Sequence, residues 1–171
     1  MSFSGMVKEE LSRHIGSGRH CRIAELAAIF TFCGSLEAGT DGKKSLRIQT
    51  ENEALSRKCF TLLVKTFNIK TDVVVRRNTG KDNYSYYIYA KGEELLAIRD
   101  TIVQAVCCKR AYIRGAFIAS GSMSDPSKSY HFEIVCHTLE QAQQLKELME
   151  FFETEPKIVE RKERMAVSYT H

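Results

Sequence analysis

The chain has 171 residues, of which 43% are hydrophobic and 27% charged, with 10 glycines and 2 prolines. These proportions are typical of a globular domain and exclude a disordered or fibrous chain. A net charge of +4 permits a nucleic-acid partner without demanding one.

The N-terminal segment is predicted to form a short helix over residues 4–15. Ser4 is placed to cap this helix, and Val7, Leu11 and Ile15 recur at every fourth residue along one face. A glycine-rich stretch then ends the helix.

A second helix is predicted over residues 20–33, and we expect it to be buried because it is apolar nearly all round. A turn-rich loop is expected over 34–44. Alternating apolar and polar residues then predict a half-buried strand over 46–49. Helical spacing returns over 51–67.

A hairpin is predicted next, because β-branched and aromatic residues over 73–77 and 84–90 flank a turn that contains a glycine. Residues 93–105 are predicted to form a helix that closes this half of the chain.

The same order of elements then restarts. We predict a helix over 108–120, a strand over 130–136, a helix over 138–152, and a hairpin formed by 157–161 and 165–169. The closing helix of the first half has no counterpart here, so we expect that the natural protein continues past the last residue or that the chain is truncated.

Identical residues recur at a separation of 87 positions, which indicates an internal duplication. The identical pairs are Cys21 and Cys108, Ala24 and Ala111, Gly34 and Gly121, and Ser35 and Ser122. We therefore predict an α+β fold with a pseudo-twofold tandem repeat, in which helix, strand, helix, hairpin and helix occur twice after a short N-terminal helix.

The six cysteines form no CxxC pair and do not stand at zinc-finger spacing from a histidine. They are Cys21, Cys33, Cys59, Cys107, Cys108 and Cys136. We expect reduced thiols in or near the core, with no metal and no cofactor. A redox role for the adjacent Cys107 and Cys108 is the alternative.

This order of elements resembles that of the LAGLIDADG homing endonucleases, whose two motif helices pack against each other at a pseudo-twofold axis. A glycine inside a helix, such as Gly115, lowers helix stability by about 1 kcal/mol relative to alanine. A close contact between the two helices would compensate for this loss. The alternative is that this glycine is merely tolerated. The resemblance predicts helix packing through Ala27, Ala28, Gly34, Gly115 and Gly121.

The chain resembles the WhiA family more closely, through the opening residues 1–11, the stretch 107–117, and Gly121-Ser122, Asp125-Pro126 and Ser129-Tyr130-His131. The resemblance implies a DNA-binding transcription regulator of sporulation, or of cell division and chromosome segregation. It implies an N-terminal segment 1–19, a first repeat 20–106 and a truncated second repeat 107–171. The family's C-terminal helix-turn-helix domain, which we expect to make most of the contact with double-stranded DNA, is absent from this chain.

A LAGLIDADG nuclease needs an acid immediately before the last glycine of each motif, where the two acids hold divalent metal ions. Cys33 and Ser120 stand at these positions, so we expect no catalytic residue and no nuclease activity. Glu37 and Asp125 lie further along, and a metal site rescued by them is the alternative.

Positive side chains on the strands and turns are the candidates for contact with DNA phosphates. They are Lys43, Lys44, Arg47, Arg76, Arg77, Lys81, Arg161, Lys162 and Arg164. Glu133, Glu160 and Glu163 oppose such contact in the second repeat. The alternative function is therefore a protein-interaction module without DNA affinity of its own, which would dock a partner regulator, an RNA polymerase component or the protein's own DNA-binding domain.

No apolar run reaches the roughly 18 residues of a membrane span, and the N-terminus lacks the apolar stretch of a signal peptide. We expect a cytoplasmic bacterial protein, associated with the nucleoid and without a membrane partner.

Overall fold

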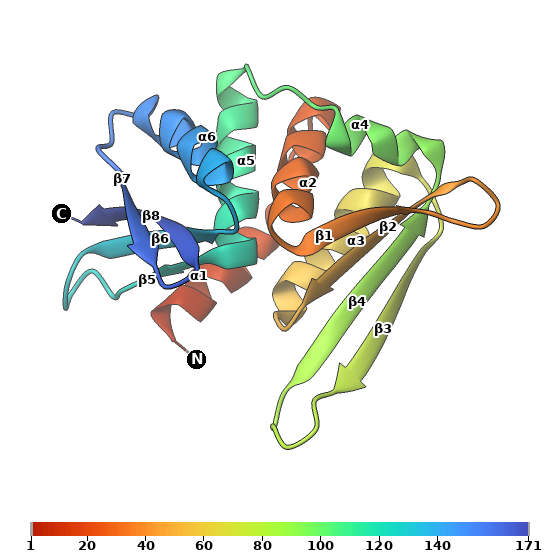
Figure 1. Cartoon of the computed structure of the whole chain (residues 1–171), viewed down its shortest axis with the longest axis horizontal. Helices are drawn as coiled ribbons and strands as arrows, with labels where there is room; N and C mark the ends of the chain where they lie inside the picture. The colour runs from red at the N-terminus through yellow and green to blue at the C-terminus, as the bar shows by residue number, and fades with distance from the viewer. Residues whose placement is uncertain (1, 171) are drawn as a thin grey trace.

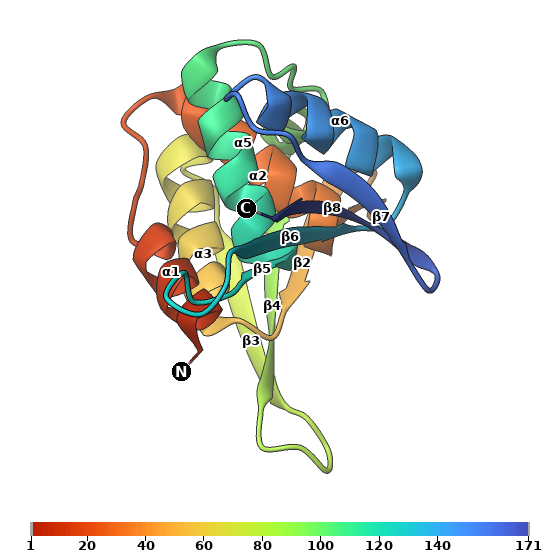
Figure 2. The same cartoon turned by 90° about the vertical axis from the view of Figure 1, so that its left-hand side faces the viewer.

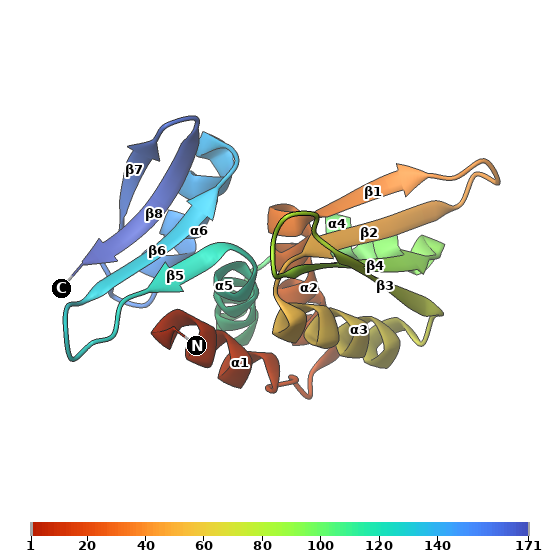
Figure 3. The same cartoon turned by 90° about the horizontal axis from the view of Figure 1, so that it is seen from below.

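Two helices of equal length lie side by side at the centre of the molecule: α2 (Arg19–Cys33) and α5 (Val106–Ser120) (Figure 1). The structure is a computed structural model that describes residues 2–170, so Met1 and His171 lie outside it. Each central helix leads directly into a four-stranded antiparallel sheet, and the two sheets lie on opposite sides of the helix pair (Figure 3).

The first repeat continues from α2 through one sheet and a helix that covers it. Its elements are β1 (Gly34–Ala38), β2 (Lys44–Thr50), α3 (Glu53–Phe67), β3 (Thr71–Arg77), β4 (Tyr84–Lys91), the 3-10 turn η1 (Glu93–Leu95) and α4 (Leu96–Arg99). The strands are ordered β1-β2-β4-β3. The β3–β4 hairpin extends beyond the rest of the molecule (Figure 2).

The second repeat follows α5 with the same order of elements and strands. Its elements are β5 (Gly121–Met123), β6 (His131–Cys136), α6 (Leu139–Glu150), β7 (Lys157–Arg161) and β8 (Arg164–Thr170). The strands are ordered β5-β6-β8-β7. The predicted α+β tandem repeat, preceded by a short helix, is therefore confirmed.

Polar caps fix the ends of the helices that cover the sheets. The Asn52 side chain accepts a hydrogen bond from the Leu55 backbone N–H at the start of α3, and the Thr138 side chain accepts one from the Gln141 N–H at the start of α6. These bonds satisfy donors that a helix leaves free in its first turn. Asn68 ends α3 in the left-handed region, at a φ of 52°.

The two repeats share one hydrophobic core rather than having one each. Leu26 and Ile29 of α2, Ile118 of α5, Ile48 of β2 and Ile134 of β6 belong to the same buried cluster. Each is at most 1% exposed. The central helices are buried because both sheets and both covering helices pack around them.

The N-terminal helix α1 (Phe3–Ser12) contacts α3, α5 and β5 (Figure 2). Its cap is Ser2, whose hydroxyl accepts a hydrogen bond from the Gly5 N–H at 3.0 Å, so the prediction that Ser4 caps the helix is wrong. The Ser4 hydroxyl instead accepts from the Met123 N–H at 2.6 Å and donates to the Met123 carbonyl at 3.2 Å. Ser4 therefore joins α1 to the second sheet.

Two other predictions differ from the structure. The expected loop over 34–44 contains β1, which pairs with β2 so that Leu36 lies opposite Leu46; β1 has too few apolar residues to show a strand pattern. The helix expected over 93–105 is interrupted and ends at Arg99. The β-branched residues that follow lose side-chain freedom in a helix, and Ile102 there is 77% exposed.

Candidate nucleic-acid interface and motif-helix ends

The two central helices approach each other closely at Gly115. A Cβ atom at this position would lie 2.7 Å from the Glu25 carbonyl oxygen and 3.1 Å from the Ala28 Cβ. Ala28 itself is fully buried and is the residue that precedes Gly115 by 87 positions. The absence of a side chain at Gly115 is what lets the two backbones touch.

The glycines that end the helices, Gly34 and Gly121, have a steric role. Both have extended backbones with negative φ. A Cβ would lie 3.0 Å from the Phe30 carbonyl oxygen at Gly34, and 2.8 Å from that of Phe117 at Gly121. Both glycines therefore permit the abrupt change from helix to strand. Ala27, the remaining predicted packing residue, is 6% exposed.

The tips of the two helices carry a thiol and a hydroxyl that are both engaged by the backbone. Cys33 donates from Sγ to the Ile29 carbonyl at 3.2 Å, and Ser120 donates from Oγ to the Val135 carbonyl at 2.7 Å. Burial raises the pKa of the Cys33 thiol to about 12, so it stays protonated at neutral pH. A neutral thiol and a hydroxyl do not fit Mg²⁺, which prefers carboxylate oxygens.

The two acids named as the alternative metal site, Glu37 and Asp125, lie away from the helix ends. Glu37 lies on β1 opposite Ser45, and Asp125 accepts hydrogen bonds from the backbone and hydroxyl of Ser127. Within residues 2–170, neither acid belongs to a group of three or more side chains close enough to hold a metal ion.

A buried charged network connects the two motif helices to α1 and α3. The Glu25 carboxylate, 1% exposed, forms ion pairs with Lys58 Nζ and with Arg114 Nε, the latter at 2.5 Å. Lys58 Nζ also donates to the carbonyls of Leu11 and His14, both at 2.8 Å. Burial lowers the pKa of Lys58, while the Glu25 charge opposes that shift. The network therefore links both motif helices to α1 and α3.

The predicted phosphate contacts in the first repeat divide between a sheet face and two turns. Lys43 and Lys81 lie in the β1–β2 and β3–β4 turns, and Lys44 is the first residue of β2 beside the former turn. We call Arg47, Gln49, Tyr87, Val74 and Arg76 the first outer face, because strand alternation and register place them on the side opposite the core. The carboxylates of Glu37 on β1 and Asp72 on β3 lie on the same side. Arg77 pairs with Tyr84 and points to the other side.

A single tyrosine orders two arginines on the first outer face. The guanidinium carbons of Arg47 and Arg76 lie 5.2 Å and 5.5 Å from the centre of the Tyr87 ring. Stacking on an aromatic ring fixes the plane of a guanidinium while leaving its donors available. Among the residues that the structure describes, neither arginine forms a salt bridge.

On the corresponding face of the second sheet, a carboxylate pairs with one of the predicted arginines. Glu133, with 13% of its side chain exposed, accepts from Arg161 Nη2 at 2.8 Å and lies 3.2 Å from His131 Nε2. Arg161 is therefore neutralised by a neighbour. Lys162 occupies the β7–β8 turn with a φ of 51°, and the exposed Arg164 begins β8.

The fold also gathers four side chains that the sequence spacing did not connect. The ligand atoms of His20, Cys21, Cys107 and Cys108 all lie within 4.8 Å of one another, at the ends of α2 and α5 away from the sheets. The 87-residue separation pairs His20 with Cys107 and Cys21 with Cys108. That repeat offset is the sequence signal that predicts their proximity.

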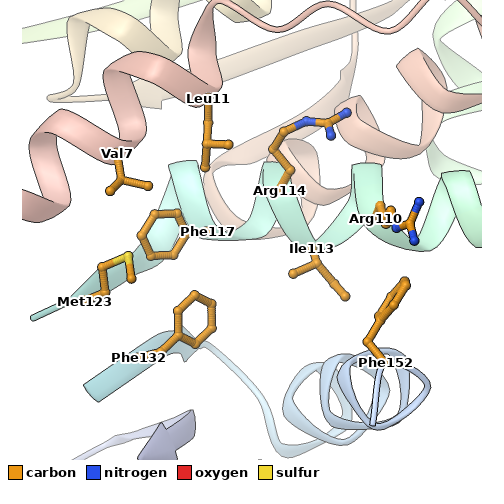
Figure 4. Close-up of a pocket in the computed structure, with 9 residues that line it drawn as sticks. All are labelled: Val7, Leu11, Arg110, Ile113, Arg114, Phe117, Met123, Phe132 and Phe152. Atoms are coloured by element: carbon orange, nitrogen blue, oxygen red, sulfur yellow. The ribbon is translucent and has the colours of Figure 1, made fainter. Parts of the chain in front are cut away.

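An apolar pocket of about 330 Å³ lies between α1, α5 and the second sheet (Figure 4). Val7 and Leu11 come from α1, and Phe117 of α5 stacks on Phe132 of β6 with ring centres 5.2 Å apart. The pocket lies on α5 and β6, the counterparts of α2 and β2. In the first repeat those two elements contact α4 and η1, respectively, whereas the described part of the second repeat has no such closing helix.

Two motif helices packed through a glycine, each leading into a four-stranded sheet, define a LAGLIDADG-type fold. I-DmoI in complex with DNA and Mn has this fold: it superposes with a TM-score of 0.68 at 10% identity, over 90% of this chain and 91% of its own. I-DmoI is a homing endonuclease. The present chain is a degenerate member of this class, because neither motif helix retains the acid.

The chain belongs to the WhiA family. Residues 19–100 match the WhiA N-terminal LAGLIDADG-like domain, and residues 109–170 match the WhiA LAGLIDADG-like domain. The probable cell division protein WhiA of Lachnoclostridium phytofermentans is 42% identical over 188 residues, and that of Alkaliphilus oremlandii is 37% identical over 185 residues. The alignments cover 98% and 95% of this chain, but 60% and 58% of those relatives.

A solved structure supports the same family at the level of the fold. Full-length DUF199/WhiA from Thermatoga maritima superposes with a TM-score of 0.83 at 23% identity, over 100% of this chain and 58% of its own. Within residues 2–170, no helix combines the length and the apolar character that crossing a membrane requires.

Proposed function

We propose that this chain is a DNA-binding part of a transcription regulator, with double-stranded DNA lying against the first outer face. The observation that carries the proposal is the pair of arginines, Arg47 and Arg76, held by Tyr87 at 5.2 Å and 5.5 Å. Arg47 donates from Nη2 to Gln49 Oε1 at 3.3 Å, and the donors that remain on the two guanidinium groups suit phosphate oxygens. The fold is also that of I-DmoI, which is bound to DNA in its solved structure.

The charge distribution makes this affinity weak and one-sided. Lysines at the turns add positive charge beside the first outer face, whereas Glu133 neutralises Arg161 on the second sheet. Contacts of this kind go to the DNA backbone and carry no direct sequence information. We propose that sequence-specific binding belongs to the family's helix-turn-helix domain, beyond residue 171.

DNA binding is tested by mobility shift at several salt concentrations. The double variant Arg47→Ala/Arg76→Ala should bind more weakly, and the slope of log K against log salt should fall by about 1.8, since each phosphate contact contributes about 0.9. The matched control is Arg57→Ala/Arg99→Ala, which removes equal charge from α3 and α4, where these side chains are 58% and 52% exposed. No binding by the parent chain at low salt refutes the proposal.

We propose further that the chain does not cut DNA. The engaged Cys33 thiol and Ser120 hydroxyl support this, because neither supplies the anionic oxygen that a magnesium-dependent nuclease requires. Incubation with supercoiled plasmid and Mg²⁺ or Mn²⁺ should leave the plasmid intact. Reproducible nicking that disappears in Glu37→Gln/Asp125→Asn would contradict this expectation and identify a rescued site.

For the whole protein we propose regulation of sporulation, or of cell division and chromosome segregation, at the bacterial nucleoid, together with a partner regulator. The relatives named probable cell division protein WhiA support the cell-division role. Within this chain, 1–19, 20–106 and 107–171 serve as the N-terminal segment and the two repeats. Deleting the gene and following nucleoid spacing and septum position tests this role.

A second candidate function is a protein-interaction module, which the apolar pocket favours. Ile113, Phe117 and Phe132 line the pocket, and the counterpart elements of the first repeat carry a short helix. This function requires the pocket to accept an apolar group. A fluorescent apolar dye should bind the chain, and Ile113→Ser should abolish that binding. If the chain also fails to shift DNA at low salt, this function replaces the first.

A further inference from the structure

A compact group of metal-ligand side chains lies at the ends of α2 and α5 that point away from both sheets. It contains His20 and Cys21 from α2, and Cys107 and Cys108 from α5, with all four ligand atoms within 4.8 Å of one another. His20 Nε2 lies 3.3 Å from Cys107 Sγ. This is the single such group in the part of the chain that the structure describes.

The pseudo-twofold symmetry of the fold explains why four ligands converge. His20 and Cys107 occupy the second position of their helices, and Cys21 and Cys108 occupy the third. Because α2 and α5 pack closely along their length, the matching positions of their first turns meet across the axis. Each repeat thus supplies two of the four ligands.

The spacing suits one ion with four ligands. Tetrahedral Zn²⁺ with bonds of about 2.3 Å to sulfur and about 2.0–2.1 Å to nitrogen has ligand–ligand edges of about 3.8 Å and 3.6 Å. Those edges lie between the 3.3 Å and 4.8 Å of the present arrangement, so small side-chain adjustments complete the site. An iron–sulfur cluster would need its ligands further apart, because iron and sulfide ions lie between them.

The surroundings carry the charge that such a site needs. Three thiolates, a neutral imidazole and Zn²⁺ give a net charge of −1. Arg110 and Arg114 line the cavity of about 270 Å³ that also contains Cys21 and Cys107. The positive ends of two helices point at the group, and neither first turn contains an acid. Soft thiolates select zinc over magnesium.

We propose that His20, Cys21, Cys107 and Cys108 form a Cys₃His site for Zn²⁺ that fastens the two repeats together. Binding releases the three thiol protons to solvent and changes no oxidation state. His20 and Cys107 are exposed at the surface, so the ion enters without unfolding. The site is structural, since four protein ligands leave no open position for a substrate.

The test uses the full chain, purified with a phosphine reductant and dialysed against Zn²⁺. Elemental analysis should find one zinc per chain, and Co²⁺ should give the intense visible bands of a tetrahedral thiolate complex. The Cys107→Ser variant should bind zinc more than about 100-fold more weakly, because loss of a mere outer-shell partner costs about 10- to 100-fold. The matched control is Cys33→Ser, which removes a thiol at the opposite end of α2. This variant should bind zinc like the parent.

A second measurement separates a bound ion from nonspecific uptake. At one zinc concentration the thermal midpoint should rise equally in the parent and in Cys33→Ser, and should rise clearly less in Cys107→Ser, because the stabilisation of the folded state grows with the ratio of ligand concentration to Kd. Circular dichroism checks that each variant is folded. Absence of zinc and of the cobalt bands from the reduced parent overturns the proposal, as does unchanged zinc affinity in folded Cys107→Ser.

Discussion

Replacing Lys58 with methionine tests whether the buried charged network holds the fold together. The Lys58 side chain is fully buried and that of Glu25 is 2% exposed. Methionine has a similar volume, so the substitution removes the charge and the donors while leaving little empty space. It also removes two hydrogen bonds of 2.8 Å, to the carbonyls of Leu11 and His14.

The expected cost follows from the remaining partners. Removing one member of a buried ion pair costs about 3–5 kcal/mol, since the other charge is left uncompensated. Arg114 still pairs with Glu25 at 2.5 Å, so the lower end of that range applies. We expect Lys58→Met to lower the free energy of unfolding by about 3 kcal/mol. That corresponds to a fall of about 6–12 °C in the thermal midpoint for a chain of this size.

Urea denaturation at neutral pH measures this change directly. The control is Lys65→Met, a substitution at an exposed position in the last turn of the same helix, which should cost less than about 1 kcal/mol. If the free energy of unfolding of Lys58→Met equals that of the parent to within about 0.5 kcal/mol, the charged network does not stabilise the fold.

Two further changes probe the motif helices. Gly115→Ala gains about 1 kcal/mol of helix propensity, but its Cβ would lie 2.7 Å from the Glu25 carbonyl oxygen. We therefore expect urea denaturation to show a net loss of about 2 kcal/mol in the free energy of unfolding. A gain in stability would show that the helices do not meet at this residue. Burial raises the pKa of Cys33 from 9.0 to about 12, which lowers its thiolate fraction at pH 8 about 1000-fold. Alkylation followed by mass spectrometry should find Cys33 unmodified in the native chain until the pH approaches 12, and labelling at the rate of a free thiol would contradict its burial.

The sequence predicted those parts of the fold that repeat or alternate strongly. The covering helices have apolar periodicity, the first central helix is apolar nearly all round, and the first hairpin has β-branched and aromatic residues on both sides of a glycine turn. The offset between Gly34 and Gly121 located the duplication. Local patterns failed where a partner distant in sequence decides the structure. Ser4 is a reasonable helix cap by its position, but its hydroxyl is satisfied by Met123, 119 residues away.

The candidate site was predictable in composition but not in arrangement. Arg47 and Arg76 were both predicted as phosphate contacts, but only the register of β2, β4 and β3 places them on the same tyrosine. Arg161 was predicted on equal terms, and its pairing with Glu133 depends on strands that meet only in the folded sheet. The group around Cys107 was missed because its ligands come from two helices and match no local spacing.

The contact at Gly115 also limits how far the two halves of the chain can be separated or altered. The two halves of the chain share one interior, since each motif helix is covered partly by the other. Separating the halves would expose the face that each motif helix presents to the other, so we expect neither half to fold stably alone. The two copies can therefore differ in their sheets, as Arg47 and the matching Glu133 do, while the contact between the motif helices is kept.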